Sequence, residues 1–306
     1  MTLPSDRFTG VLAAALTPQT KDLIPDEKLM AAHCQWLLAN GCDGLAILGT
    51  TGEANSFCLK ERIRVIEGLV EAGVPGDKLM PGTGSCALTD TVNLTKVALN
   101  VGARGVLMLP PFYYKNPSDD GLFAFYSNVI QQVGDDRLKI YLYHFPQMSA
   151  TPISYNLIEM LLKAYPETVV GMKDSSGNFD NMAGAAKNFP GFCVLTGGDD
   201  TLLGLLEHGG GGCITACANV ASTLAAEVYH GFHAGKDVSA ANAKLLNVRD
   251  AVAKFPYSAG LKTLMARHSG DDRWLNLRPP LQNLSDEQTD ALCAGFDATD
   301  YQMPAV

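Results

Sequence analysis

Residues 169–178 read Val-Val-Gly-Met-Lys-Asp-Ser-Ser-Gly-Asn, a stretch in which a short apolar run ends with a lysine. Polar residues and glycine bound the run, which is typical of a buried strand. Lys173 comes at the carboxyl end of this strand, directly before residues typical of a turn. An amine withdrawn from water is more readily neutral, and a neutral amine can attack a ketone or an aldehyde to form a Schiff base. The alternative is a strand-end lysine whose apolar stem carries its ammonium out into water.

Apolar runs of this kind recur along the chain and alternate with helical patterns. The predicted strands are residues 10–16, 44–48, 78–82, 105–109, 139–143, 169–173, 192–196 and 212–215. The predicted helices are residues 25–40, 61–71, 89–101, 122–133, 156–164 and 201–207. Strand centres about 20 to 35 residues apart are typical of βα units, and this alternation predicts a parallel sheet. Eight such units in about 220 residues predict an α/β fold, a (β/α)8 TIM barrel.

A doubly wound sheet is the alternative architecture, and it requires a G-x-G-x-x-G motif after the first strand. No such motif follows residues 10–16. Beyond Val220 the sequence is helical, without a further strong strand pattern. We therefore expect a barrel formed by residues 1–220 and a C-terminal helical extension, residues 221–306, packed on it.

Composition and charge restrict the classes of partner. The 306 residues are 47% hydrophobic and 18% charged, as expected of a globular core. A formal net charge of −9 argues against nucleic acid and anionic membrane surfaces as partners. No apolar run approaches the roughly 20 residues of a membrane span, and residues 1–9 lack the features of a signal peptide. We expect a cytoplasmic protein that acts on a small molecule.

Eight cysteines occur without any C-x-x-C pair. In a chain of this size they are expected to be reduced core residues. Cys213 and Cys217 are close in sequence, but no histidine lies near them at the spacing of a zinc site. We therefore expect no metal site.

The loop after the second predicted strand reads Gly49-Thr50-Thr51-Gly52-Glu53. Catalytic residues of such barrels gather at the carboxyl ends of the strands. Backbone N–H groups of a glycine-rich loop can hold a carboxylate without a basic side chain. A glycine turn followed by a helix cap is the alternative reading of this loop.

Tyrosines mark the ends of two further strands. Tyr113 and Tyr114 lie in a proline-rich loop after the fourth, and exposed aromatic residues there indicate an interface. Strand alternation places Tyr141 and Tyr143 on one face of the fifth, with Tyr143 near the mouth of the barrel. A phenol at that point is a candidate proton donor and acceptor. His144 is expected to face away from Tyr143 and to be structural.

The last two strands are bordered by glycines and lead to a candidate binding region around Gly198 and Ile214. Such loops often form a phosphate site in barrels, but no arginine or lysine accompanies them here. We expect close backbone approach to a small uncharged part of a substrate.

Taken together, residues 49–53, 143–146 and 170–178 resemble the dihydrodipicolinate synthase / N-acetylneuraminate lyase family of class I Schiff-base enzymes. The resemblance implies that Lys173 forms a Schiff base with pyruvate or another 2-keto acid and that no cofactor is needed. It also implies that Tyr143 moves the proton and that Thr50 and Thr51 bind the carboxylate, with Thr51 part of the catalytic set. Family members are commonly homotetramers, dimers of dimers in which one tyrosine crosses into the neighbouring site. Whether Tyr113 or Tyr114 would cross is open.

The departures from the family pattern concern the second substrate. Synthases of this family place an arginine two residues after the proline, whereas Met148 occupies that position here. Residues 84–86 and the helix after Glu53 also lack the histidine and asparagine that bind lysine in feedback-regulated synthases. Four hypotheses follow. The protein is an aldolase that releases pyruvate and an aldehyde, a dehydratase of 2-keto-3-deoxy acids, dihydrodipicolinate synthase itself, or a non-catalytic barrel that binds a keto acid.

Overall fold

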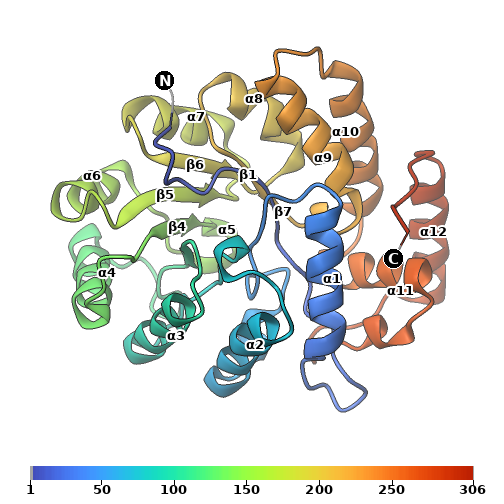
Figure 1. Cartoon of the computed structure of the whole chain (residues 1–306), viewed down its shortest axis with the longest axis horizontal. Helices are drawn as coiled ribbons and strands as arrows, with labels where there is room; N and C mark the ends of the chain where they lie inside the picture. Colours follow the sequence, from blue (N-terminus) through green and yellow to red (C-terminus); the bar gives the residue numbers. More distant parts are fainter. Residues whose placement is uncertain (1–2, 306) are drawn as a thin grey trace.

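A parallel sheet curled into a barrel forms the centre of the protein (Figure 1). The computed structural model describes residues 3–305. The strands are β1 (Gly10–Ala13), β2 (Gly44–Leu45), β3 (Val106–Met108), β4 (Ile140–His144), β5 (Val169–Asp174), β6 (Cys193–Thr196) and β7 (Gly212–Thr215). Their order in the sheet is β2-β1-β7-β6-β5-β4-β3.

Residues 78–82, predicted to be the third strand, are extended but do not form a regular strand. The Met80 N–H donates to the Leu45 carbonyl at 2.8 Å, and the Leu107 N–H donates to the Pro81 carbonyl at 2.9 Å. Pro81 has no N–H to donate, so the ladder on the side of β3 lacks one hydrogen bond, whereas Met80 and Gly82 both donate on the side of β2. The segment nevertheless connects β2 with β3 and occupies the eighth position around the barrel. The predicted α/β TIM-barrel fold is confirmed, with seven regular strands within residues 3–305.

Helices surround the barrel. They are α1 (Glu27–Ala39), α2 (Leu59–Glu71), α3 (Leu88–Asn100), α4 (Asp119–Val133), α6 (Tyr155–Ala164), α7 (Phe179–Asn188), α8 (Leu202–Glu207) and α9 (Ala218–His233), with short helical turns at η1 (Ala54–Ser56), η2 (Gly76–Lys78), α5 (Pro146–Ser149) and η3 (Asp199–Thr201). The sequence analysis missed α7, in which only Met182 and Ala185 are buried. The start of α7 could have been predicted from Asn178, because asparagine is a favoured N-cap residue and its side chain here accepts a hydrogen bond from the Asn181 N–H.

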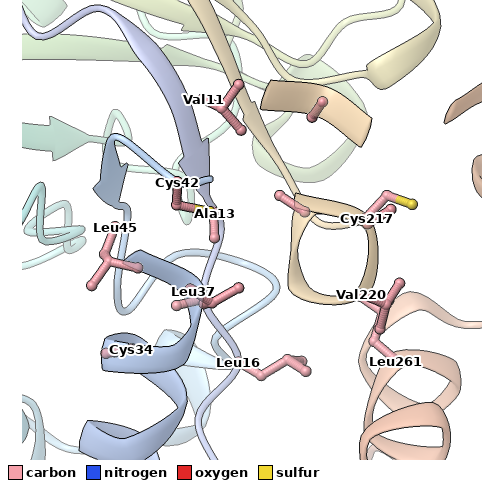
Figure 2. Packing of buried hydrophobic residues seen from close by; sticks show 14 of the residues in the cluster. Val11, Ala13, Leu16, Cys34, Leu37, Cys42, Leu45, Cys217, Val220 and Leu261 are labelled. Carbon is pink, nitrogen blue, oxygen red and sulfur yellow. The ribbon is translucent and has the colours of Figure 1, made fainter. Parts of the chain in front are cut away.

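Two layers of apolar side chains lie on either side of the strands. The inner layer fills the barrel and includes Leu12, Tyr141, Leu195 and Ile214. The outer layer packs the strands against the helices. Figure 2 shows part of it, in which side chains of β1 and α1 belong to the same cluster as Val220 and Leu261. The alternation of strand side chains therefore separates a barrel interior from a helical exterior.

The C-terminal helices lie on one side of the barrel (Figure 1). They are α10 (Ser239–Val252), α11 (Tyr257–Ser269), η4 (Asp272–Leu275) and α12 (Asp286–Asp297). The expected boundary at residues 220/221 lies inside α9, where the backbone of Ala221 is not helical (φ −133°, ψ 29°). The division into a barrel and an extension remains a prediction.

Five cysteines (34, 42, 193, 213 and 217) are buried, as expected of core residues. Cys58 and Cys86 are exposed, so the expectation is wrong for these two. Cys58 lies directly before α2 and Cys86 two residues before α3, and Cys293, in α12, is half-buried. Among residues 3–305, no helix combines the length and the apolar character needed to cross a bilayer.

Candidate active site

Lys173 and Tyr143 face each other inside the barrel. They are register partners on the neighbouring strands β5 and β4, and both are buried, Lys173 being 5% exposed. The Lys173 Nζ lies 4.6 Å from the centre of the Tyr143 ring. A cation at this distance is attracted by the face of an aromatic ring. Lys173 therefore does not extend into water, and the alternative of a solvent-reaching lysine is wrong.

The loop after β2 brings a threonine to this pair. The Thr50 Oγ1 lies 3.4 Å from the Tyr143 hydroxyl. Left-handed backbone at Leu48 (φ 54°) and Glu53 (φ 57°) turns the chain before and after the two threonines. Gly52 passes so close to the segment after β1 that a Cβ there would lie 2.8 Å from the Ala15 carbonyl oxygen, which excludes larger residues. The loop thus has a compact fold that presents the Thr50 hydroxyl to Tyr143.

Thr51 is held through its backbone. Its carbonyl accepts a hydrogen bond of 3.4 Å from the Ser258 hydroxyl on α11. Inside the loop, the Ala54 N–H donates to the Gly49 carbonyl at 3.1 Å. Of the two predicted threonines, Thr50 therefore lies within reach of the Tyr143 hydroxyl, whereas the contact given for Thr51 attaches it to α11.

A cavity opens beside Tyr143 and Thr50. It is lined by Leu48, Gly49, Thr50, Ala54, Asn55, Arg62, Gly82, Gly84, Leu107, Leu109 and Tyr143. The buried Arg62 donates to the Gly82 carbonyl at 2.8 Å, and burial lowers the pKa of Arg62 to about 10. The sequence analysis missed this cation because Lys60, Glu61 and Arg64 surround it in α2, a pattern typical of an exposed helix face.

Tyr113 and Tyr114 are not part of this group within one chain. They are 72% and 80% exposed and pack edge to face, with ring centres 5.4 Å apart. Their loop lies between β3 and α4. Among residues 3–305, no contact brings either ring to Lys173 or Tyr143.

Gly198 and Ile214 have different surroundings. The Gly198 N–H donates to the Thr196 hydroxyl at 3.0 Å, so this N–H is used within its own turn. Ile214 lies in the inner apolar layer with Tyr143. In this turn it is Gly197 whose backbone comes close to another part of the chain, since a Cβ at Gly197 would lie only 2.0 Å from the Ser175 side-chain oxygen. That approach is between neighbouring strand ends rather than toward a ligand.

His144 is structural, as expected. Its Nδ1 accepts a hydrogen bond of 3.0 Å from the Ile153 N–H, and burial lowers its pKa. Its register partner on β5 is Asp174, which accepts from the Ser176 N–H at 2.7 Å and from the Asn181 amide at 2.7 Å. These contacts fix the ends of β4 and β5 directly beyond Tyr143 and Lys173.

Asp199, at the start of η3, is a buried carboxyl group without a compensating cation in contact. It is 3% exposed, and its Oδ1 has no hydrogen-bonding partner among residues 3–305. Its neighbour Asp200 pairs with Arg249 at 3.1 Å instead. Burial raises the pKa of Asp199 to about 6 because the low-dielectric interior disfavours the charged form.

This carboxyl group predicts a pH-dependent stability. Unfolded Asp has a pKa of about 3.9, so between about pH 4 and pH 6 the folded state holds a proton that the unfolded state releases. The free energy of unfolding therefore falls as pH rises through this window. We expect Asp199→Asn to be more stable than the unsubstituted protein at pH 8, by about 1–3 kcal/mol, and equally stable near pH 4. Urea unfolding at both pH values measures this. The same difference at both values would contradict the assignment.

In residues 3–305, no group of three or more His, Cys, Asp or Glu side chains is arranged to hold a metal ion. The polar groups of the site are instead an amine, a phenol and hydroxyls. Such a set suits covalent chemistry at a carbonyl carbon.

Comparison with known proteins identifies the family of this chain. The model of the dihydrodipicolinate synthetase family matches residues 7–298. An uncharacterized DapA-like lyase of Chloroflexus aurantiacus is 35% identical, covering 94% of this chain and 96% of the relative. A 4-hydroxy-tetrahydrodipicolinate synthase of Agrobacterium fabrum is 33% identical, covering 93% and 95%.

Solved structures show the same relationship. The crystal structure of dihydrodipicolinate synthase from Agrobacterium tumefaciens has a TM-score of 0.88 at 32% identity and covers 95% of this chain and 99% of that one. The E. coli K12 prophage protein YagE, solved in complex with pyruvate, has a TM-score of 0.87 at 25% identity and covers 96% and 99%. The chain therefore belongs to the dihydrodipicolinate synthetase family and is, like the members of that family, a lyase.

Proposed function

We propose that this protein is a class I Schiff-base lyase that cleaves a 2-keto-3-deoxy sugar acid to pyruvate and an aldehyde, through an imine on Lys173. The observation that carries the proposal is the buried Lys173 amine, 4.6 Å from the ring of Tyr143, at the carboxyl end of the barrel. An amine enclosed in this way is shielded from water, and a phenol stands beside it to exchange protons.

The reaction balances with these groups alone. The Lys173 amine adds to the C2 carbonyl, and loss of water gives the imine. When the C3–C4 bond breaks, its electron pair moves toward the imine nitrogen while the C4 hydroxyl gives up its proton and becomes the aldehyde. For this, Tyr143 first gives its phenolic proton to the water that leaves as the protonated imine forms. The resulting phenolate accepts the C4 hydroxyl proton, with Thr50, 3.4 Å from the phenol oxygen, as the relay, and the phenol then supplies the proton that the enamine takes up at C3. Protonation of the enamine at C3 and addition of water release pyruvate and the free amine.

Binding of the keto acid is assigned to the loop after β2. Thr50 and Thr51 and their backbone N–H groups would hold the carboxylate. Contact of Gly198 and Ile214 with the rest of the substrate remains a prediction. The same imine would serve a dehydratase, in which the bond to a hydroxyl group breaks instead of C3–C4.

We infer an oligomer, by family likeness a homotetramer, because of the loop that carries Tyr113 and Tyr114. Two neighbouring tyrosines at 72% and 80% exposure form an apolar surface that association would cover. In such an assembly one of them would enter the site of the neighbouring subunit. Light scattering of the purified protein tests the assembly.

Dihydrodipicolinate synthase is the second candidate, because relatives at 33–35% identity carry the name 4-hydroxy-tetrahydrodipicolinate synthase. Against it stands the residue at position 148. Met148 is 60% exposed and uncharged, and its neighbour Gln147 donates to the Ser176 carbonyl at 2.5 Å. Neither of these two side chains offers a cation to the carboxylate of a second substrate.

Borohydride reduction in the presence of pyruvate, followed by peptide mass analysis, tests the proposed function. A reduced pyruvyl adduct on Lys173 is the expected result. Pyruvate release from 2-keto-3-deoxy sugar acids, compared with turnover of aspartate semialdehyde, then separates the lyase from the synthase. Absence of the adduct, under conditions that fully trap a known class I lyase, would exclude the mechanism.

The position of Met148 gives a prediction on specificity. Met148→Arg should raise kcat/KM for aldehydes that carry a carboxylate by about 10- to 100-fold, since a charge-assisted contact contributes about 1.5–3 kcal/mol. Condensation rates of pyruvate with a carboxylated aldehyde and with its neutral analogue measure the effect. Met148→Gln, which adds no charge, is the control. An equal gain in both variants would contradict this reading of the position.

A further inference from the structure

A buried ion pair connects the loop after β2 with helix α11. The Lys262 Nζ lies 2.5 Å from the Glu53 Oε1, and the two side chains are 1% and 0% exposed. Glu53 ends the loop that carries the two threonines. Lys262 belongs to the C-terminal helices, and its neighbour Leu261 anchors α11 in the outer core (Figure 2).

Further hydrogen bonds complete this pair. The Gln19 amide donates to the Glu53 Oε2 at 2.9 Å, and Lys262 donates to the Asn276 carbonyl at 3.0 Å. The Asn276 amide in turn donates to the Gln19 carbonyl at 2.8 Å. The network thus joins the segment after β1, the loop after β2 and the C-terminal helices into one closed unit.

Stability alone does not account for an ion pair of this kind. Removing two charges from water costs free energy, and replacing a buried pair by apolar side chains is often neutral or stabilising. In some proteins a buried pair of this kind instead fixes one specific geometry of the segments that it joins. Here the pair would fix the loop after β2, whose backbone is left-handed at Glu53. This loop carries the two threonine hydroxyl groups of the proposed binding site.

The neighbouring contacts act on the same loop. The Thr17 hydroxyl donates to the Gly52 carbonyl at 2.9 Å, and Ser258, on the same helix as Lys262, donates to the Thr51 carbonyl at 3.4 Å. Both sides of the loop are therefore attached, one to the segment after β1 and the other to α11.

We propose that Glu53 and Lys262 are positioning residues, which hold Thr50 and Thr51 in the geometry that binds the carboxylate of the keto acid. The inference rests on the proposed function, in which these threonines receive that carboxylate. It assigns a role in the site to the C-terminal helices, which contribute Lys262 and Ser258 to the support of the loop.

The test uses an apolar replacement of the pair, Glu53→Leu with Lys262→Met in one protein. We expect the pyruvate concentration that half-saturates borohydride trapping to rise by about 10- to 100-fold, because small displacements of binding groups have effects of this size. The melting temperature and the trapping rate at saturating pyruvate should stay close to those of the unsubstituted protein. Arg267→Met is the control, since it removes an exposed ion pair with Asp297 from the same helix and should change neither quantity.

The outcomes separate the two proposals. Half-saturation that is unchanged in the double variant, while the unsubstituted protein is trapped, would overturn the positioning role and leave the lyase mechanism in place. Failure to trap the unsubstituted protein would overturn both. Should the double variant not fold, Glu53→Gln with Lys262→Met serves instead. It keeps the shape at position 53 and the contact with Gln19, and it leaves no charge buried without a partner. The same rise in half-saturation is expected, with an unchanged value again overturning the role.

Discussion

Lys173→Ala should give no borohydride-trapped adduct with pyruvate and should lose lyase turnover by more than about a thousandfold, since removal of a covalent nucleophile has effects of this size or larger. The physical reason is that the imine withdraws electrons from the breaking bond, and no other described amine lies against Tyr143. Intact-mass analysis after reduction and a coupled assay for pyruvate release measure the two effects.

Lys163→Ala is the matched control for this variant, because Lys163 is an exposed lysine near the end of α6. It should trap and turn over like the unsubstituted protein. If Lys173→Ala retained the adduct, another amine would be the nucleophile. If it lost the adduct but kept turnover, the reaction would not proceed through an imine.

Tyr143→Phe should lower kcat by about 10²- to 10⁴-fold, the range that proton transfer by a positioned side chain contributes. The ring, and with it the contact to Lys173, is retained, so the half-saturating concentration of pyruvate should change little. Stability should also change little, because the only hydrogen-bonding contact of the phenol within residues 3–305 is the long one, 3.4 Å, to Thr50. Steady-state kinetics and thermal unfolding of the same preparations check all three expectations.

Tyr141→Phe is the matched control, one pleat earlier on the same strand. The Tyr141 hydroxyl accepts the Phe8 N–H at 2.5 Å, deep in the barrel and away from Lys173. Its loss leaves a buried N–H without a partner, which costs about 1–3 kcal/mol of stability, and kcat should be kept. The two variants thus predict opposite patterns. A large loss of kcat in Tyr141→Phe with little loss in Tyr143→Phe would place the proton transfer elsewhere.

The barrel could be predicted from the sequence because its signal is local and repeated. An apolar run of four or five residues followed by a helix depends only on neighbours in the chain, and eight repeats leave few architectures. The proximity of Lys173 and Tyr143 could be predicted for the same reason. Both residues end predicted strands, and the carboxyl ends of parallel strands meet at one face of the barrel.

Other features depended on the tertiary structure alone. No local sequence pattern predicts that the third strand becomes irregular at Pro81, or that Arg62 is buried although its helix has a charged sequence. The same is true of the hydrogen bond that Gly198 forms within its own turn. The Glu53–Lys262 pair joins residues far apart in the sequence, and neither residue type predicts burial. Sequence patterns report the preference of each segment for a conformation and for a buried face. Which buried faces meet, and which charges are then enclosed together, is decided only when all the segments pack.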